Sequence, residues 1–497
     1  MNLADVIRRN AAFAPGKVAL RFEGGTISYG ALSGRIEATA ALLAGEFGIG
    51  KGDRVAILAY NHPDTLVLLY ACARLGAMLV PLNWRLAGPE LAYILADADP
   101  ALFVADEHFA KEAAELAAGR SNLPLFSVGE AAGSLGELIA SGGEGSSRCE
   151  GRLSDPLLVV YTSGTTGRPK GALLRQEALV WNGVMSQHMH GLTSDDHVLT
   201  VLPFFHVGGL NIQTTPALHQ GATVTIHSRF APDTTLAAIA DDRPTLTVLV
   251  PATLGAVLSH PGFGSADLSS LRAITTGSTY VPQALIDPFE RRGVPVLQVY
   301  GATETCPISV YTRLGGPRPE GSTGWPGPFC EAKLVDDAGR ELPDGTSGEI
   351  WIRGPQILSG YWRDEAATRD SIVDGWFRTG DIASRDAAGA YYVHDRKKNV
   401  VISGGENIYP AEIERVLLEH EAVAECAVIG RPDPRWGEVP VAHVVLRAGA
   451  SCTAESLSAH VLSQLARFKA PKDFIFADSL PKSALGKVQH HLLRERR

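Results

Sequence analysis

Residues 161–171 read YTSGTTGRPKG and follow directly on the apolar run Leu157–Val160. The apolar run is typical of a buried strand, and the segment after it combines hydroxyl side chains, glycines and the cation Lys170. Backbone N–H groups, hydroxyls and a lysine can together hold phosphate oxygens, and glycine lets the backbone approach them closely. The segment is not a Walker A loop, because Lys170 lies between Pro169 and Gly171 instead of between a glycine and a Ser/Thr. We therefore predict a phosphate-binding loop after a strand.

Strand and helix patterns alternate on both sides of this loop. Continuous apolar strands separated by helices are typical of parallel sheets that are covered on both faces. The run Pro63–Leu75 predicts a helix between two such strands. The predicted strands are Val55–Ala59, Met78–Pro81, Leu157–Thr162, Val198–Leu202, Ala222–Ile226, Leu246–Val250, Leu271–Thr276 and Val296–Tyr300.

The pattern changes after about Gly327. Ala332–Val335, Gly348–Arg353 and Ile382–His394 predict short antiparallel strands joined by Asp/Gly turns. The last hundred residues predict a compact α+β unit, in which Pro410 begins a helix. We therefore expect an α/β protein. Its large N-terminal domain, residues 1–395, has parallel-rich sheets layered with helices and a β-rich subdomain at about 328–395; its small, mobile C-terminal α+β domain covers residues 396–497.

Length and composition agree with this plan. At roughly 100–200 residues per domain, 497 residues predict two to four domains. Hydrophobic residues make up 45% of the chain, which excludes a disordered protein. The net charge of −9 disfavours a nucleic-acid binder. Residues 396–497 nevertheless carry 15 Lys+Arg against 12 Asp+Glu. Either an anionic ligand or an ordinary solvated surface accounts for that local excess.

Cellular location is predicted from cysteines and apolar segments. The six cysteines form no CxxC pair, which indicates neither a disulfide framework nor a zinc ribbon and suits a reducing cytoplasm. No segment reaches the roughly 18 uninterrupted apolar residues of a membrane span. The first residues, MNLADVIRRNAAFAPG, lack the apolar region of a signal peptide. We expect a cytoplasmic protein.

Four further motifs carry polar groups, and each alone has an ordinary structural interpretation. YGATE, residues 300–304, places Glu304 after a strand, as a Mg²⁺ ligand or as a helix cap. WFRTGD ends at Asp381, which either accepts ribose hydroxyls or belongs to a turn. SGGENIYP, residues 403–410, could be a plain loop before a helix, and Lys487 in PKSALGK could be a solvated charge.

The order and spacing of the five motifs decide between these readings. Together they resemble the adenylate-forming superfamily, which includes acyl-CoA synthetases, nonribosomal-peptide adenylation domains and beetle luciferases. The resemblance covers essentially the whole chain. Two segments are most similar to the corresponding segments of bacterial feruloyl (hydroxycinnamate) and medium- or long-chain fatty acid CoA ligases. They are SGGENIYPAEIE and GRPDPRWGEVPVAHVV.

The resemblance implies two half-reactions that use ATP, Mg²⁺ and coenzyme A. A carboxylate attacks the α-phosphate of ATP to give acyl-AMP and pyrophosphate, and the thiol of coenzyme A then displaces AMP. By similarity, Lys487 bridges the carboxylate and the α-phosphate, Asp381 with Arg396 binds the ribose, and Glu304 with Thr165 binds Mg²⁺. The residues implied for the β- and γ-phosphates are Thr162, Ser163, Gly164, Thr165, Thr166, Gly167 and Lys170. Those implied beside the adenine are Gly277, Ser278, Thr279, Tyr300, Gly301 and Thr303.

The second half-reaction in this family follows a swing of the C-terminal domain. The resemblance places the hinge at Lys398. It also implies that Ser403, Gly404, Gly405 and Glu406 line the pantetheine tunnel, and that Trp436 and Lys472 contact the coenzyme A nucleotide.

The acyl pocket is implied at the ends of the same strands. His206, in LPFFHVGGL, matches the family's gating residue beside the nascent thioester. Malonate-activating relatives carry an Arg where this chain has Val299, so a dicarboxylate would bury an unpaired charge. The implied pocket residues are His206, Val207, Gly208, Gly277, Val299, Gly301, Cys306 and Pro307. Such an apolar pocket fits an aromatic acid as well as an alkyl chain, and both remain open.

Some alternatives also remain open. His188, His190, His197, Asp195 and Asp196 could suggest a metal site, but we expect solvated or capping roles and no zinc. The chain could instead load a separate carrier protein, or bind ATP or acyl-AMP without catalysis. The expected partners are a small carboxylate, ATP and coenzyme A, with no nucleic acid; the oligomeric state is open, a homodimer being one option.

Overall fold

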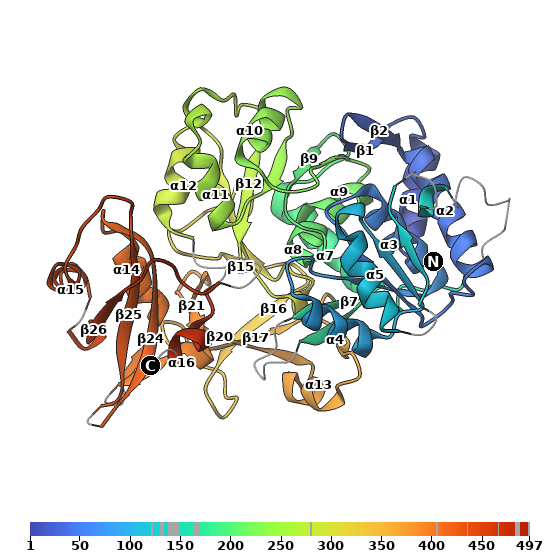
Figure 1. The fold of residues 1–497 in the computed structure, drawn as a ribbon. Coiled ribbons are helices and arrows are strands. Elements are labelled where there is room, and N and C mark those ends of the chain that lie inside the picture. Colours follow the sequence, from blue (N-terminus) through green and yellow to red (C-terminus); the bar gives the residue numbers. More distant parts are fainter. Residues whose placement is uncertain are drawn as a thin grey trace. The chain divides into compact units, whose positions relative to one another are not determined.

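The computed structural model describes residues 1–120, 123–129, 134–137, 149–162, 169–278, 281–403, 406–434, 436–465, 467–482 and 488–495 (Figure 1). By internal contacts the chain divides into two units. The first comprises Met1–Ala332 and Ile352–Phe377, and the second comprises Lys333–Trp351 and Arg378–Arg497. Within the described ranges, none of the helices combines the length and apolar character that crossing a bilayer requires.

A nine-stranded sheet forms one part of the first unit, with the order β15-β14-β13-β12-β11-β9-β10-β1-β2. Every neighbouring pair from β13 to β1 is parallel, as the continuous apolar runs predict. The strands are β1 (Val18–Phe22), β2 (Gly25–Ser28), β9 (His197–Thr200), β10 (Thr223–Ile226), β11 (Leu246–Val248), β12 (Ala273–Gly277), β13 (Val296–Tyr300), β14 (Val310–Tyr311) and β15 (Trp325–Pro326).

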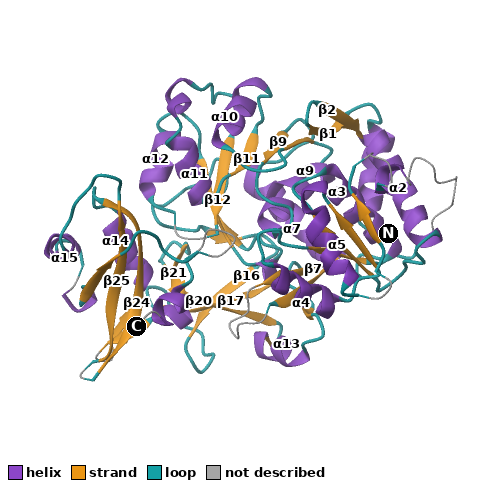
Figure 2. Ribbon diagram, in the orientation of Figure 1, coloured by secondary structure: helices purple, strands orange, loops and turns teal. Residues whose placement is uncertain are grey.

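Helices cover this sheet (Figure 2). A core that includes Leu199, Ile274 and Val296 of the sheet packs against Leu254 and Phe289 of the helices. The helices on this side are α10 (Pro232–Asp241), α11 (Pro251–Leu258) and α12 (Gln283–Glu290).

A seven-stranded sheet forms the other part, with the order β18-β8-β7-β4-β3-β5-β6. Its centre is parallel, whereas β8 is antiparallel to β7 and β18 is antiparallel to β8. The strands are β3 (Arg54–Leu58), β4 (Met78–Pro81), β5 (Leu102–Ala105), β6 (Leu125–Ser127), β7 (Pro156–Thr162), β8 (Lys170–Arg175) and β18 (Gly360–Tyr361). The remaining longer helices of the unit are α1 (Ala4–Phe13), α2 (Tyr29–Gly45), α3 (Pro63–Leu75), α4 (Gly88–Ala98), α5 (Ala110–Ala118), α7 (Gln176–His190) and α13 (Glu365–Ser371).

Helix α3 shows why these bounds follow from the sequence. His62 caps its N-terminus by accepting a hydrogen bond from the Asp64 N–H at 3.1 Å, and Pro63 occupies the first turn, where its missing N–H costs nothing. Gly76 ends the helix with a φ of 76°, a left-handed conformation that favours glycine. Almost every side chain of α3 is buried, in agreement with its nearly continuous apolar sequence.

The second unit contains a sheet with the order β23-β22-β25-β24, and β26 pairs in parallel with β25. Its core joins Val428 and Val444 of the sheet to Ile413, Leu457 and Val461 of two helices. The elements are β22 (Val401–Ser403), β23 (Glu406–Ile408), α14 (Pro410–Leu418), β24 (Val423–Asp433), β25 (Gly437–Leu446), α15 (Ala454–Leu462), β26 (Asp473–Phe476) and α16 (His490–Glu495).

The predicted β-rich region is a further sheet with the order β16-β17-β20-β19, and β21 pairs with β20. The division between the two units passes through β16, β17 and β20. The strands are β16 (Glu331–Val335), β17 (Ser347–Arg353), β19 (Ile372–Val373), β20 (Trp376–Arg385) and β21 (Tyr391–Arg396). The predicted α/β class, with a large parallel-rich part and a smaller C-terminal α+β part, is confirmed. The boundary at Arg396 stays a prediction.

Candidate functional site

Three side chains from separate motifs meet in the first unit, and we call them the strand-end cluster: Lys170, Glu304 and Tyr361. The Tyr361 hydroxyl donates a hydrogen bond to Glu304 Oε1 at 2.9 Å. The Lys170 ammonium lies 5.7 Å from the centre of the Tyr361 ring and 3.7 Å from Asp364 Oδ2. Tyr361 thus has a cation over its ring and a hard carboxylate oxygen at its hydroxyl, an arrangement suited to an anion together with a divalent cation.

The predicted phosphate loop is closed at its base by a β-ladder. Thr162 at the end of β7 faces Lys170 at the start of β8, and Tyr161 faces Gly171. The chain therefore leaves β7 and enters β8 at the same end of this strand pair. The loop residues Ser163, Gly164, Thr165, Thr166 and Gly167 lie outside the described residues.

Two glycines at the ends of β12 and β13 have no space for a side chain. A Cβ added at Gly277 would overlap the Val299 carbonyl oxygen, and one at Gly301 would overlap the Pro307 carbonyl oxygen. Ser278, next to Gly277, has a φ of 79°, a conformation that costs a non-glycine residue energy and recurs at functional sites. The two strand ends are therefore tightly packed where adenine binding is predicted; Thr279 falls outside the described ranges.

Tyr300 and Thr303 lie in sequence on either side of Gly301, which packs closely against the Pro307 carbonyl oxygen. The backbone carbonyl of Tyr300 accepts a hydrogen bond from the Ser309 N–H at 3.2 Å, and Thr303 is buried in a short 3-10 turn. Glu304, the predicted metal ligand, lies in the same turn, and its side chain accepts a hydrogen bond from Tyr361.

The predicted acyl-pocket residues are uncharged, apart from His206, which can take up a proton, and all are buried except the half-buried His206 and Gly301. The His206 Nδ1 atom accepts a hydrogen bond from the Gly208 N–H at 2.9 Å, so a neutral His206 carries its proton on Nε2. Cys306 is fully buried, and burial raises the pKa of its thiol, which excludes a reactive thiolate. The pocket residues with no or little exposure are Val207, Gly208, Gly277, Val299, Cys306 and Pro307.

The predicted ribose pair lies in the second unit. Arg396 Nε is 2.7 Å from Asp381 Oδ1, and the two residues face each other across the β20–β21 ladder. Asp381 is only 6% exposed, and its N–H donates to Thr379 Oγ1 at 3.1 Å. The structure therefore brings Asp381 and Arg396 together, as the resemblance implies.

The predicted hinge residue, Lys398, follows Arg396 by two positions. Lys398 lies in a 3-10 turn at Lys397–Asn399, directly after β21. Burial and the neighbouring Arg396 and Arg494 lower the pKa of Lys398. Asp395, which directly precedes Arg396, accepts hydrogen bonds from Asn399 Nδ2 at 3.1 Å and from the Ala411 N–H at 3.0 Å.

The structure describes only some of the residues implied for coenzyme A binding. Ser403 ends β22 and pairs with Gly437, and Glu406 begins β23 opposite Ser403. Trp436 is 43% exposed, and Lys472 is exposed. Gly404, Gly405 and Lys487 lie outside the described residues.

One expectation is wrong for His190. We expected the histidines and aspartates around the end of α7 to be solvated or to cap it, but His190 is fully buried and bonded to Ser186 and Thr275. Asp196 does cap the following turn, because its Oδ2 accepts from the Thr193 N–H at 2.8 Å, and it also pairs with Arg272. Among the described residues no three His, Cys, Asp or Glu side chains are grouped as for a metal ion.

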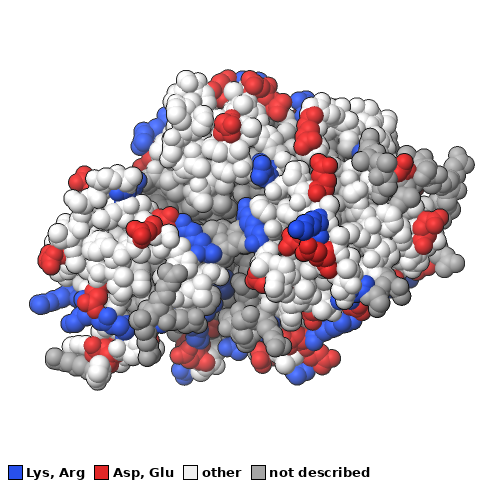
Figure 3. Space-filling view, viewed as in Figure 1, with Lys and Arg blue, Asp and Glu red and all other residues white. Residues whose placement is uncertain are grey.

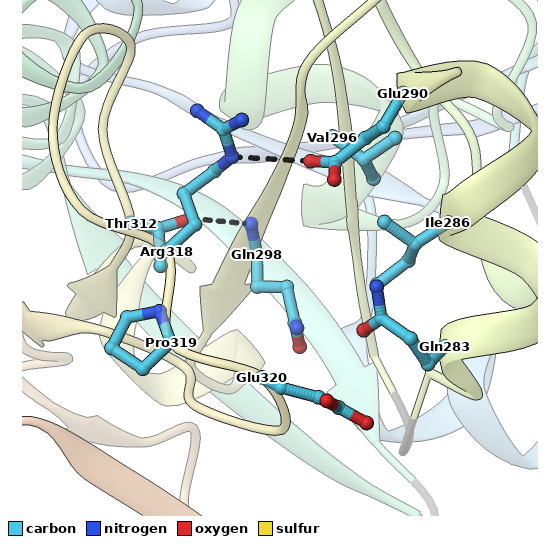
Figure 4. Close-up of a pocket in the computed structure, with 9 residues that line it drawn as sticks. All are labelled: Gln283, Ile286, Glu290, Val296, Gln298, Thr312, Arg318, Pro319 and Glu320. Carbon is cyan, nitrogen blue, oxygen red and sulfur yellow. Dashed lines mark hydrogen bonds and ion pairs between the residues drawn. The ribbon is translucent and has the colours of Figure 1, made fainter.

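A small pocket lies elsewhere, beside α12 and the segment after β14 (Figure 4). It has a volume of about 60 Å³, and Arg318 Nε pairs with Glu290 Oε1 across it at 3.2 Å. Of the predicted site residues that the structure describes, none lines it. On the face shown in Figure 3, acidic and basic side chains are interspersed over the described surface.

Sequence reasoning missed Tyr361 and Asp364. Both lie almost 200 residues after Lys170, and β18 carries Tyr361 to β8, where it faces Ala172. The only local signal was the aromatic pair after Gly360, which alone indicates packing as readily as a site.

Comparisons with known proteins agree with this geometry. Residues 7–362 match the profile described as AMP-binding enzyme, and residues 412–487 match the AMP-binding enzyme C-terminal domain. The chain is 47% identical to an indoleacetate–CoA ligase of Aromatoleum aromaticum, over 100% of this chain and 98% of the relative. It is 41% identical to a feruloyl-CoA synthase of an Amycolatopsis species, over 98% and 97%. The solved o-succinylbenzoate CoA synthetase of Bacillus subtilis, in complex with the acyl-adenylate OSB-AMP, has a TM-score of 0.90 and 32% identity, with 100% of this chain and 99% of that chain covered.

Proposed function

The chain belongs to the family of AMP-binding enzymes, as an acyl/aryl-CoA ligase that works through an acyl-AMP intermediate, and we propose that its substrate is a hydrophobic aromatic monocarboxylic acid. A carboxylate oxygen attacks the α-phosphorus of ATP and pyrophosphate leaves. The sulfur of coenzyme A then attacks the acyl carbon, the thiol proton is lost, and AMP leaves. Both steps join anions, so the protein's main task is to neutralise charge and to position the reactants.

The observation that carries the substrate proposal is the neutral character of the acyl-pocket residues. Val207, Val299 and Cys306 are buried, and none carries a charge that could pair with a second carboxylate. The two relatives with the higher identities are named for indoleacetate and for a feruloyl product, both derived from aromatic monocarboxylic acids. A flat ring fills a buried apolar pocket with a large area at little conformational cost.

The ATP side of the proposal rests on the strand-end cluster. Lys170 would neutralise the β- and γ-phosphates together with the loop Thr162–Gly167. Glu304 would bind Mg²⁺, which in protein sites is held by one or two carboxylates plus substrate phosphates. One hard carboxylate oxygen beside a lysine fits that pattern. Mg²⁺, when bound, would offset the charge of the phosphates.

The remaining roles follow the family resemblance. Asp381 and Arg396 would hold the ribose, and Lys487 would contact the carboxylate and the α-phosphate. Lys398 would be the pivot between the half-reactions, after which Ser403–Glu406, Trp436 and Lys472 would meet coenzyme A. His206 would lie beside the thioester carbon. We also propose a cytoplasmic location, which six cysteines without a disulfide support.

A panel of acids tests this proposal. The purified chain is incubated with Mg·ATP and one acid, with and without coenzyme A; AMP is measured, and the acyl-CoA is identified by mass spectrometry. The panel contains indole-3-acetate, ferulate, cinnamate, o-succinylbenzoate, octanoate, palmitate and acetate. We expect coenzyme A-dependent AMP release that is fastest with aromatic monocarboxylates. A preference for the dicarboxylate or for palmitate would refute the substrate class, and the absence of acyl-CoA with every acid would refute the ligase assignment.

A further inference from the structure

The hydroxyl of Tyr161 lies at the base of the predicted phosphate loop and is held by a helix from another part of the chain. Tyr161 is on β7, directly before Thr162, and it faces Gly171 on β8. Its hydroxyl donates a hydrogen bond to Asp97 Oδ2 at 2.6 Å. Burial and the hydrogen bond to Asp97 raise the pKa of Tyr161, so the hydroxyl keeps its proton and remains the donor. Asp97 belongs to the last turn of α4.

The other side of the loop base is connected to the same residue. The backbone N–H of Trp362 donates to the Gly171 carbonyl at 2.7 Å, and its indole Nε1–H donates to the backbone carbonyl of Asp97 at 3.0 Å. Arg363 Nη1 donates to that same carbonyl at 3.1 Å. Asp97 therefore holds β7 through its side chain and β8 through Trp362, and these are the two strands that lead into and out of the loop.

The packing at Gly171 shows how closely these groups fit. A Cβ added there would lie 3.2 Å from Tyr161 Cζ and 3.3 Å from Trp362 Cβ. Gly171 is thus enclosed by the two side chains that Asp97 contacts. Because closely packed groups transmit small displacements, a shift of either side chain would reach the main chain next to Lys170.

The electrostatics of α4 indicate that Asp97 is there for a specific contact. The last carbonyls of a helix carry partial negative charge, so a carboxylate in the last turn is unfavourable. The last turn of α4, which is described throughout, holds no basic residue, and Asp99 adds a second carboxylate just after it. Asp99 has an ordinary surface ion pair, with Arg120 at 2.7 Å. Asp97 is half-buried, and the hydrogen bond from Tyr161 accounts for its position.

The dipeptide Tyr361–Trp362 links this contact to the strand-end cluster. Tyr361 contacts Lys170 and Glu304, whereas the next side chain, that of Trp362, contacts Asp97. One short segment therefore joins the last turn of α4 to the residues proposed to hold phosphates and Mg²⁺.

We propose that Asp97 is a positioning residue for ATP: by holding Tyr161 and Trp362 it keeps β7 and β8 in the arrangement in which the predicted phosphate loop can bind the β- and γ-phosphates. The inference rests on the proposed function, in which this loop binds those phosphates. Asp97 acts through its two neighbours and not by contact with ATP. It should therefore affect the step that uses ATP and not the step that uses acyl-AMP, since acyl-AMP carries neither phosphate.

Carboxylate-dependent ATP–pyrophosphate exchange by the full chain provides the test. The KM values for Mg·ATP and for the best acid of the panel are measured, and acyl-CoA formation is measured separately from isolated acyl-AMP. Asp97→Ala removes the carboxylate, and Tyr161→Phe removes only the hydroxyl. Each should raise the KM for Mg·ATP by about tenfold, because a hydrogen bond to a charged group is lost. The KM for the acid and the rate from acyl-AMP should stay within about twofold of the unmodified chain.

Three further variants ask whether the effect belongs to this one contact. The double variant Asp97→Ala/Tyr161→Phe should also show an increase of about tenfold, and not the product of the two single effects, because both changes remove the same hydrogen bond. Asp97→Asn keeps an acceptor oxygen and should remain within about threefold of the unmodified chain. Asp99→Asn is the matched control: it removes the neighbouring charge at the same helix end, asparagine tolerates the left-handed φ of 49° there, and the KM for Mg·ATP should not change.

The possible results separate this inference from the proposed function. An unchanged KM for Mg·ATP in Asp97→Ala and Tyr161→Phe overturns the role of Asp97. Equal losses in exchange and in acyl-CoA formation from acyl-AMP overturn it as well, because they would indicate general damage to the fold; in both cases the ligase stands. Tyr161→Phe keeps the ring beside Gly171, so it answers the question even if Asp97→Ala fails to fold. If the unmodified chain shows no exchange with any acid, the proposed function fails, and the inference fails with it.

Discussion

The strand-end cluster and a second group in the same unit differ in chemical character. The second group, here called the His190 cluster, consists of the hydrogen-bonded residues Ser186, His190, Gln213 and Thr275. Lys170 and Glu304 of the first group are charged and partly exposed, and Tyr361 contacts both of them. The His190 cluster is neutral and wholly buried. The difference matches two tasks. Every acid that the enzyme activates shares ATP, so the charged contacts should act on all substrates alike, whereas the buried neutral contacts join α7, the turn Leu210–Thr214 and β12 within the fold.

The largest expected effect concerns Lys487, the cation proposed to contact the reacting atoms. Lys487→Ala should lower carboxylate-dependent ATP–pyrophosphate exchange by about 1,000-fold, because a positioned charge on the developing transition state is lost. The loss should be equal for every acid in the panel. Normal exchange by the variant would remove Lys487 from the reaction, and a loss that varied from acid to acid would break the division of tasks.

Glu304 tests the charged cluster itself. Glu304→Gln keeps the shape but removes the charge, and it should lower exchange by roughly 100-fold and raise the Mg²⁺ concentration needed for half-maximal rate. Tyr361→Phe, which removes only the hydrogen bond to Glu304, is the matched control and should have a much smaller effect. An unchanged Mg²⁺ requirement in Glu304→Gln would argue against Glu304 as a metal ligand.

Lys398 tests whether the two half-reactions depend on different parts of the chain. Proline fixes φ and removes the N–H, so Lys398→Pro should restrict rotation in the turn after β21. Acyl-CoA formation from isolated acyl-AMP should fall by roughly tenfold more than pyrophosphate exchange does. Lys397→Ala, next in sequence, offers a control that keeps backbone freedom. Equal losses in both half-reactions would count against a hinge at this residue.

The smallest expected effect is on stability and concerns the neutral cluster. Because the folded-state pKa of His190 is about 4 against about 6.5 in the unfolded chain, folding excludes a proton, and stability should fall as pH drops below about 6.5. Between pH 7.5 and 5.5 this linkage amounts to about 1.4 kcal/mol. His190→Gln should be less stable at pH 7.5 but should lose about 1 kcal/mol less over that interval in urea unfolding. An identical pH dependence would mean that His190 is not the group that titrates.

Features that are marked locally in the sequence could be predicted from it. Helix Pro63–Leu75 and strands Met78–Pro81 and Val296–Tyr300 have the predicted bounds, because proline, glycine and apolar runs mark them locally. The Asp381–Arg396 pair was also anticipated. Charged residues next to glycines after a strand are rare enough to be noticed in a sequence.

Contacts between distant segments could not be predicted in this way. β8 was not predicted, because KGALLR follows a loop and has no turn signal of its own, and so Tyr361 on β18 was missed. The burial of His190 was missed as well. Its signal lay in the spacing of Asn182, Ser186 and His190, four residues apart on one face of α7 and all fully buried, a pattern that polar residues normally present to solvent.

The packing at Gly277 and Gly301 has a practical consequence for anyone who wants to redirect this ligase to new acids. Any substitution at either glycine would force a side chain into a neighbouring backbone carbonyl, so combinatorial libraries that randomise them would consist largely of misfolded members. Diversity is better placed at Val207 and Val299, the predicted pocket residues that already carry a side chain. Selection would then sample new acids on an intact scaffold.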